Sequence, residues 1–364
     1  MARQAIIMIG LVALCVGTHK KHPPPATAPP PAAAPRPAEA VAGLPVPAGL
    51  ESRIEFWTQI FSEIPSSRTL VYHRDHPEII YSRIRFDWLN VLSSLFAPQD
   101  LEKIRARREA EVVNKYRQLL ARLASLAKEP GGLAGLDPAH PDYYRLKRLA
   151  SLFEGIPDPD KFAQAAGPGM IRVQRGRADE FERSYRRAYP QLSLFEDIFQ
   201  DEGVPPALTR LVFIESMFQA EAVSPAGAAG LWQLMPDTGR QYLTINETKD
   251  ERLDTWRSTR AAAQLLRANY QRLQSWPLAV TAYNTGPSRM KRASNRLLTQ
   301  NLADIISDSD EPGFGFAGKN FYAELLGLLA AERSLKSSHE GFPWLDSDSA
   351  LSAAPAFVPQ LIAD

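Results

Sequence analysis

The chain has 364 residues, of which 45% are hydrophobic and 23% charged, the composition of an ordinary globular protein. With 42 Lys and Arg against 41 Asp and Glu, the formal net charge is +1, so no overall basic field favours nucleic-acid binding. The one cysteine, Cys15, excludes a disulfide framework and a multi-thiolate metal site. All six histidines lie outside residues 141–338, so a site in that stretch works without imidazole. We therefore expect neither a metal nor another cofactor.

The first 22 residues have the pattern of an export signal. Arg3 precedes an apolar run, residues 5–16, that is too short to span a bilayer as a helix. Cys15 ends a sequence similar to a lipoprotein cleavage box, except that Leu14 stands where a small residue is usual. The alternative is ordinary signal cleavage near Gly17. Both readings predict an exported, periplasmic protein, and the first adds lipidation of Cys15 and anchoring to the outer membrane.

Residues 23–49 are predicted to be a disordered tether. They hold 10 of the 30 prolines and 9 alanines, and such a segment cannot bury enough apolar surface to fold. In the polyproline II geometry of about 3.1 Å per residue, its reach is on the order of 80 Å. A tether of that length would hold a folded domain away from an anchor. At the other end, residues 337–364 are predicted to form a C-terminal tail.

Residues 51–200 are predicted to form a mostly helical accessory region with a small β-hairpin. The hairpin comprises residues 69–73 and 78–84, which flank a turn containing proline. His73 and His76 have the spacing of metal ligands, but no third ligand cluster accompanies them, so a structural or solvated role is favoured. Apolar residues spaced three and four apart predict amphipathic helices over residues 99–128, 142–153, 178–189 and 191–201.

The candidate catalytic group is Glu215. It falls within the apolar stripe of a helix predicted over residues 205–219, which begins with proline, as the first turn of a helix permits. The stripe comprises Leu208, Leu211, Val212 and Phe218. A carboxylate held against apolar side chains has its pKa raised, as a general acid at neutral pH requires. The alternative is a structural glutamate paired with a neighbour such as Arg210.

The segment that follows, residues 223–236, has groups that suit a sugar ligand. Small residues let the backbone approach a ligand closely, while an amide and an aromatic face match the hydroxyls and apolar faces of a sugar. The alternative is a tight helical connection with a core tryptophan. The residues in question are Ser224, Gly227, Gly230, Trp232 and Gln233.

Two further helices are predicted, over residues 259–273 with Ser258 as the cap and over residues 277–284. Tyr283 lies at the C-terminal end of the second. Its phenol is in a position to hydrogen-bond the carboxyl of Glu215, and the alternative is an ordinary core tyrosine.

Together these segments resemble the catalytic domain of bacterial lytic transglycosylases, the peptidoglycan-cleaving family with a goose-type lysozyme-like fold. Three motifs in order and at consistent spacing are a specific signal. The resemblance is clear over residues 203–290, weaker to residue 333, and strongest to the membrane-bound lytic murein transglycosylase D branch. The matching residues are Glu215-Ser216, Ser224-Pro225, residues 227–233 (GAAGLWQ) with Met235-Pro236, and Ala282-Tyr283-Asn284 with Gly286.

The resemblance implies a mainly α chain with a lysozyme-like catalytic domain over residues 201–336. It makes Glu215 the single general acid and then base. The later family motif, Glu-Thr-Arg before Asn-Tyr-Val, appears here as residues 318–324 (GKNFYAE), which lack its acidic and arginine positions. The substrate-binding positions that it implies are Ser216, Ser224, Gly230, Trp232, Gln233, Tyr283, Asn284 and Tyr322.

The implied reaction is cleavage of the β-1,4 bond between N-acetylmuramic acid and N-acetylglucosamine in peptidoglycan glycan strands, with formation of a 1,6-anhydromuramic acid end. One alternative is a hydrolytic muramidase, in which water attacks instead of the C6 hydroxyl. Another is a catalytically inactive peptidoglycan-binding scaffold, suggested by the altered residues 318–324.

A usual glycosidase needs a second carboxylate, about 5 Å away for retention or farther for inversion. Four carboxylates that follow Glu215 in the chain are candidates for this partner, but each lies near turn residues or basic neighbours and outside the apolar stripe of Glu215. We therefore expect a mechanism with one carboxylate and no second one within about 5.5 Å. The carboxylates considered are Glu221, Asp237, Asp250 and Asp254.

Overall fold

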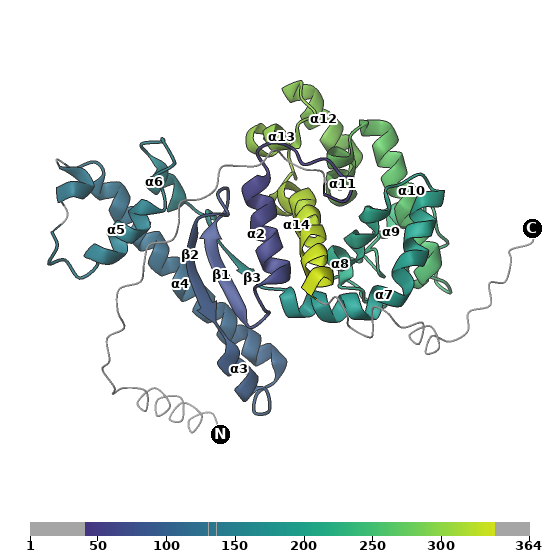
Figure 1. The fold of residues 1–364 in the computed structure, drawn as a ribbon, viewed down its shortest axis with the longest axis horizontal. Helices are drawn as coiled ribbons and strands as arrows, with labels where there is room; N and C mark the ends of the chain where they lie inside the picture. The colour runs from purple at the N-terminus through teal and green to yellow at the C-terminus, as the bar shows by residue number, and fades with distance from the viewer. Residues whose placement is uncertain (1–40, 130, 136, 339–364) are drawn as a thin grey trace, which may run out of the picture. The chain divides into compact units, whose positions relative to one another are not determined.

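The computed structural model describes residues 41–129, 131–135 and 137–338. The predicted export signal, Cys15, most of the tether and the tail beyond residue 338 lie outside these ranges. The mainly α fold is confirmed, since helices dominate and the described part contains a single three-stranded sheet (Figure 1). No helix in the described ranges has the length and apolar character needed to cross a membrane.

The predicted hairpin is present and gains a third strand. β1 (Arg68–His73) pairs antiparallel with β2 (Ile80–Arg85) on one side and with β3 (Ile171–Arg175), which the sequence did not indicate, on the other. Because side chains alternate across a strand, Leu70 and Tyr72 of β1 enter one hydrophobic core while Val71 enters another. The sheet therefore separates two cores.

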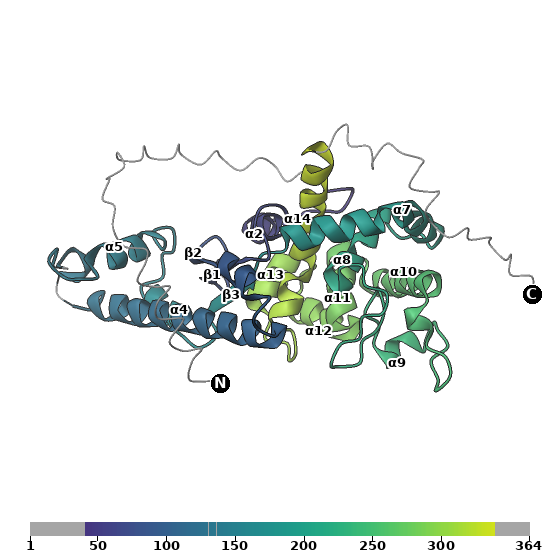
Figure 2. The ribbon, with the colours of Figure 1, turned by 90° about the horizontal axis from the view of Figure 1, so that it is seen from below.

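The first core is built by α2 (Glu51–Ser62), α7 (Ala178–Asp201), α14 (Phe316–Ser338) and the helices between α7 and α14. α2 and α14 lie next to each other in both views (Figures 1 and 2). Gly327 permits this approach, because a Cβ there would lie 2.6 Å from the Cβ of Trp57. The predicted accessory region and catalytic domain thus share one core, and the boundary predicted near residue 200 is not a break in packing.

The second core lies on the other face of the sheet. It is formed by α3 (Asp87–Leu92), α4 (Pro98–Leu126), α5 (Tyr143–Ser151) and α6 (Lys161–Ala165), with the short 3₁₀ helix η1 (Gly132–Gly135) between α4 and α5. The predictions of α4 and α5 were correct within two residues at each end. Both helices turn leucines into this core, which is typical of amphipathic helices.

α7 is one helix, although the sequence predicted two. The break was expected at Pro190, which has no N–H for the intrahelical ladder. The helix continues through it because its buried stripe remains in the first core on both sides of the proline. Residues of that stripe are Phe181, Tyr185, Leu192, Phe195 and Phe199.

The end of the predicted tether belongs to the fold. Leu44 is fully buried in the first core, and the carbonyl of Pro45 accepts a hydrogen bond of 2.7 Å from the Tyr322 hydroxyl. The prediction of disorder through residue 49 was therefore wrong for residues 41–49. A proline-rich composition does not show that one leucine of the segment is buried in a core formed by distant helices.

The remaining elements form the region that follows α7. Asp254, and not Ser258, caps α10, since its carboxylate accepts from the backbone N–H groups of Trp256 (3.0 Å) and Arg257 (2.8 Å). The helix consequently begins four residues earlier than predicted. In chain order the elements are η2 (Pro206–Arg210), α8 (Leu211–Ser216), α9 (Pro236–Gly239), η3 (Glu251–Leu253), α10 (Thr255–Leu273), α11 (Trp276–Thr285), α12 (Pro287–Leu297) and α13 (Leu302–Asp308).

Candidate active site

Glu215 lies at the end of α8, a short helix that follows η2. The long helix predicted over residues 205–219 is thus divided, and it stops because Met217 and Phe218 both adopt positive φ, 50° and 58°. Such left-handed backbone is costly for residues with a side chain and is frequent at functional sites. The apolar stripe is confirmed, with Leu208, Leu211 and Val212 fully buried and Phe218 partly buried against the same core.

Glu215 opens onto a cleft of about 480 Å³. One wall is the first half of α7, and the other is the loop that runs from the end of α8 to Gln233. The lining residues are Arg177, Glu180, Arg183, Arg187, Glu215, Ser216, Met217, Gln219, Ala222, Val223, Ser224 and Gln233. A concave site with one catalytically suited carboxyl group and several polar groups is the geometry of a ligand-binding active site.

The environment of Glu215 favours its protonated form. Burial, and then the nearby charge of Glu324, raises the pKa of Glu215 to about 8. Its carboxyl has no ion pair or hydrogen bond to any described residue. Arg210, the alternative partner, is held instead by Glu196 and by Glu332 at 2.7 and 2.9 Å. Glu215 is therefore available as a proton donor at neutral pH.

Glu324 on α14 is a second carboxylate that sequence reasoning missed. Burial raises its pKa to about 7, against the opposing charge of Arg177. It was missed because only carboxylates near Glu215 in the chain were considered, whereas α14 reaches the site from more than a hundred residues away. The available signal was a glutamate beside Tyr322 and Leu325, both buried residues of an apolar helix.

The carboxylates that were considered have other roles. Asp237 is exposed and pairs with Arg240 at 2.9 Å, and Asp250 pairs with Arg252 at 2.7 Å. Asp254 caps α10, and Glu221 is exposed. None of these four lines the cleft.

Three predicted substrate-binding residues line the cleft with Glu215. The hydroxyl of Ser216 donates to the Leu231 carbonyl at 2.9 Å, and that of Ser224 accepts from the Ala228 N–H at 3.0 Å. Gln233 donates its amide hydrogens to the carbonyls of Ala222 and Gly230, at 3.1 and 2.9 Å. These bonds hold the wall of the cleft in shape. Part of the hydrogen-bonding capacity that was predicted to bind the substrate is therefore used within the loop.

The structure does not place two of the predicted residues where a substrate can reach them. Trp232 is fully buried, donates its indole N–H to Thr259 at 2.9 Å and stacks on Phe199. Tyr322 is 1% exposed and donates to Pro45. Both are core residues here, which corrects their predicted contact with a sugar; the core tryptophan was the alternative considered for Trp232.

The two predicted substrate-binding residues at the end of α11, Tyr283 and Asn284, have different surroundings. Tyr283 donates its hydroxyl hydrogen to the Trp232 carbonyl at 2.7 Å, and not to Glu215 as predicted. Burial, and then the nearby charge of Glu215, raise the pKa of Tyr283, so the two side chains still lie near each other. Asn284 is exposed and is not among the residues that line the cleft.

Gly230 lets two segments of backbone pack closely together. Its φ is +79°, and a Cβ there would lie 1.9 Å from the Arg252 carbonyl oxygen. The Arg252 side chain donates to the carbonyls of Gly227 (2.7 Å) and Leu234 (2.9 Å), so the loop closes around it. The close approach predicted for Gly230 is therefore to protein backbone.

Replacing Gly230 by Ala is expected to destabilise the protein by roughly 3 kcal/mol, since a left-handed backbone and a backbone clash both oppose the methyl group. Urea unfolding measures this. The matched control is Gly227→Ala, which has a similar φ of +87° but no atom within 4 Å of the new Cβ. It is expected to cost about 1 kcal/mol. Equal losses in the two variants would show that the clash contributes nothing.

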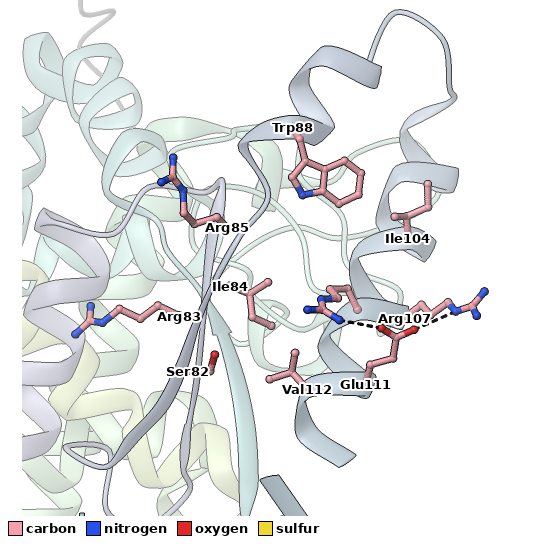
Figure 3. A pocket seen from close by; sticks show the side chains of 10 residues that line it. Ser82, Arg83, Ile84, Arg85, Trp88, Ile104, Arg107, Glu111 and Val112 are labelled. Carbon is pink, nitrogen blue, oxygen red and sulfur yellow. Dashed lines mark hydrogen bonds and ion pairs between the residues drawn. The ribbon is translucent and has the colours of Figure 1, made fainter. Parts of the chain in front are cut away.

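A larger pocket of about 550 Å³ lies between β2, α3 and α4 (Figure 3). Trp88 stands at one end of it, and Arg83 and Arg85 point away from α4. Glu111 is the carboxylate in its lining, and it is bridged by Arg107 at 3.4 Å and Arg108 at 3.2 Å. The one carboxylate in this lining is thus paired with two guanidinium groups, whereas Glu215 has no such partner among the described residues, so this pocket does not replace the Glu215 cleft as the candidate site.

His73 is structural. Its Nδ1 accepts from the N–H groups of Asp75 (3.2 Å) and His76 (3.1 Å), which shapes the turn after β1, and burial lowers its pKa to about 4. Among the described residues, no group of three or more His, Cys, Asp or Glu is arranged to hold a metal ion.

Comparison with known proteins gives a family for part of the chain. Residues 194–304 match the model of the transglycosylase SLT domain. Membrane-bound lytic murein transglycosylase D of Escherichia coli K12 is 38% identical over 109 residues, which are 29% of this chain and 24% of that protein. Membrane-bound lytic murein transglycosylase F of Alcanivorax borkumensis is 33% identical over 143 residues, 34% of this chain and 29% of that protein. The chain thus spans less than a third of the length of these relatives.

Among solved structures, the lytic transglycosylase Slt of Pseudomonas aeruginosa matches with a TM-score of 0.31 and 20% identity, covering 65% of this chain and 34% of that one. The 70 kDa soluble lytic transglycosylase of Escherichia coli matches with a TM-score of 0.33 and 16% identity, covering 65% and 44%. The sequence relatives and the family model confirm the resemblance drawn from the three motifs. The chain therefore carries a transglycosylase SLT domain over residues 194–304.

Proposed function

We propose that the protein is a lytic transglycosylase that cleaves the β-1,4 bond between N-acetylmuramic acid and N-acetylglucosamine in peptidoglycan. The observation that carries this proposal is Glu215, a carboxyl group in a cleft with a pKa of about 8 and no ion pair within the described residues. A general acid is most effective when its pKa is near the operating pH. The SLT domain match and the names of the relatives support the substrate.

In the proposed mechanism, Glu215 donates its proton to the glycosidic oxygen as the bond to the anomeric carbon breaks. The 2-acetamido group of the muramic acid stabilises the positive charge that develops, as in substrate-assisted glycosidases. The ionised Glu215 then takes the proton from the C6 hydroxyl of the same sugar. That oxygen attacks the anomeric carbon and closes the 1,6-anhydro ring, so no water is consumed and Glu215 ends protonated as it began.

The position of Glu324 supports a single catalytic carboxylate. A retaining or inverting glycosidase needs its two carboxyl groups on the two sides of the scissile bond. Glu324 influences Glu215 electrostatically but is not among the residues that line the cleft. The other carboxylate that lines the cleft, Glu180, pairs with Arg177 at 3.6 Å.

The test is mass spectrometry of purified peptidoglycan sacculi after digestion, with and without a chelator. The proposal expects products with 1,6-anhydromuramic acid ends, in equal amounts under both conditions. Products one water heavier, without anhydro ends, would establish the hydrolytic muramidase instead. No release of fragments, together with retained binding of sacculi by wild type and by Glu215→Gln, would establish the scaffold.

Removing the charge of Glu324 is expected to shift the pH dependence of cleavage. The active form has Glu215 protonated, so kcat/KM falls as pH rises through the pKa of Glu215. Since the Glu324 charge raises that pKa, Glu324→Gln lowers it and moves the alkaline limb of the profile to lower pH. Asp237→Asn, at an exposed carboxylate, is the control and should leave the limb in place. An unmoved limb in the Glu324 variant would contradict the coupling.

We also propose that the chain is exported to the periplasm and anchored to the outer membrane through lipidation of Cys15. The apolar run before Cys15 and the tether after it support this, as do the membrane-bound names of the relatives. Expressed in a bacterium with lipoprotein processing, wild type is expected in the membrane fraction and Cys15→Ser in the soluble periplasmic fraction. The same distribution for both would remove lipidation from the proposal.

A further inference from the structure

Three arginines stand along the α7 wall of the Glu215 cleft. Arg177 directly precedes α7, and Arg183 and Arg187 lie one turn apart on it. We call these three residues the arginine stripe. Arg177 pairs at 3.6 Å with Glu180, which also lines the cleft. This wall of the cleft therefore presents three guanidinium groups and one carboxylate, and Arg183 and Arg187 are not paired with that carboxylate.

The surroundings leave the arginine stripe able to bind another anion. Arg187 donates to the Met217 carbonyl at 3.0 Å and has no ion pair with a described carboxylate. Arg183 contacts Asp179 at 3.2 Å with 61% of its side chain exposed, and Asp179 also accepts from the N–H and hydroxyl of Ser66. A guanidinium has five N–H donors, so both arginines keep donors free for a carboxylate.

The stripe also has a length that suits a short peptide. Ten residues separate Arg177 from Arg187, which is about 15 Å along a helix at 1.5 Å per residue. An extended peptide of four residues spans about 13–14 Å. A glycan recognised through hydroxyl and amide groups does not require cations, whereas guanidinium groups bind the carboxylates of a peptide well.

We propose that the arginine stripe binds the carboxylates of the short acidic peptide attached to muramic acid, so that the cleft selects peptide-bearing over peptide-free glycan. The inference rests on the proposed function, because it places the glycan beside Glu215. It adds a second recognition element on α7 before residue 194, outside the segment that matches the SLT domain. The carboxylates form bidentate bonds with Arg183 and Arg187.

The experiment compares kcat/KM on glycan with intact peptides and on glycan from which an amidase has removed them. The double variant Arg183→Gln with Arg187→Gln is expected to lower the ratio of the two values about tenfold, and raising the salt concentration should lower the wild-type ratio. Arg186→Gln removes the same charge from the same helix outside the cleft and should leave the ratio unchanged. An unchanged ratio in the double variant, or an equal fall in Arg186→Gln, overturns the inference.

A binding measurement distinguishes this inference from the proposed function. In the Glu215→Gln protein, peptide-bearing oligosaccharide is expected to bind about tenfold more tightly than the same oligosaccharide with its peptide carboxylates amidated. Equal affinities overturn the role of the arginine stripe even if anhydro products form. Absence of anhydro products from wild type overturns the proposed reaction, while the difference in affinity still measures the stripe.

Discussion

Replacing Glu215 by Gln is expected to lower kcat for cleavage of sacculi by at least about 10³-fold while the protein still binds glycan. Gln keeps the shape of the side chain but has no proton to give to the glycosidic oxygen and cannot accept one from the C6 hydroxyl. Loss of a general acid and base typically costs 10²- to 10⁴-fold. Quantified release of anhydro-ended fragments measures the loss, and sedimentation with sacculi measures binding.

The control for this variant is Glu221→Gln, an exposed carboxylate in the loop after α8 that does not line the cleft. It should cleave as wild type does. If Glu215→Gln retained more than about a tenth of the wild-type kcat, another group would have to supply the proton, and Glu324 would be the first to examine.

The same Glu215→Gln substitution is expected to stabilise the protein at alkaline pH. A carboxyl whose pKa is higher in the folded than in the unfolded state favours folding below the unfolded value, about 4.5, and this contribution is lost as pH rises toward 8. The neutral amide of Gln does not incur this loss. At pH 8 the free energy of unfolding of the variant should therefore be roughly 2–4 kcal/mol higher than that of wild type. Melting curves at pH 5 and pH 8 measure it, since the gain should appear at pH 8 and nearly vanish at pH 5. A gain that is the same at both pH values would contradict the raised pKa.

The second large effect concerns the buried pair of Arg210 and Glu332, which holds η2 against α14. Arg210 is bound by both Glu332 oxygens, at 2.7 and 2.9 Å, and Glu332 also accepts from Tyr185 at 3.0 Å and pairs with Lys336 at 2.8 Å. Glu332→Ala removes the bidentate partner of the buried Arg210 guanidinium and leaves it only the half-buried Glu196 as an ion-pair partner among the described residues. We expect it to lower the free energy of unfolding by about 3–5 kcal/mol, measured by urea unfolding.

Two controls show whether loss of the buried ion pair is the cause. Lys103→Ala breaks a surface pair with Asp100, whose side chains are 77% and 48% exposed, and should cost no more than about 1 kcal/mol. Combining Glu332→Leu with Arg210→Met replaces the buried pair by apolar groups and should recover most of the loss. Without that recovery, the loss would have to be assigned to packing around Glu332. The pair matters for the site because η2 leads directly into α8 and Glu215.

The helical class and the candidate acid were predictable because both depend on local patterns. Periodicity of three and four identified α4 and α5, and it placed Glu215 in the stripe of Leu208, Leu211 and Val212, which the structure buries as expected. The three motifs identified the family segment before any fold was known. Local sequence patterns gave wrong predictions where the packing partners of a residue are distant in the chain. Examples are Pro190 in α7 and Leu44 in the proline-rich segment.

The sequence by itself determined the mainly α class, the SLT segment and the identity of the carboxyl group aimed at the interior. Only the tertiary structure decided the state of that group, because its pKa depends on burial by the surrounding helices and on Glu324, which lies 109 positions further along the chain. It also decided that Trp232 and Tyr322 belong to the core and that α7 forms the arginine-lined wall of the cleft. Periodicity reports which face of a helix is buried, whereas the electrostatics of a site is set by charges that meet only when distant helices pack together.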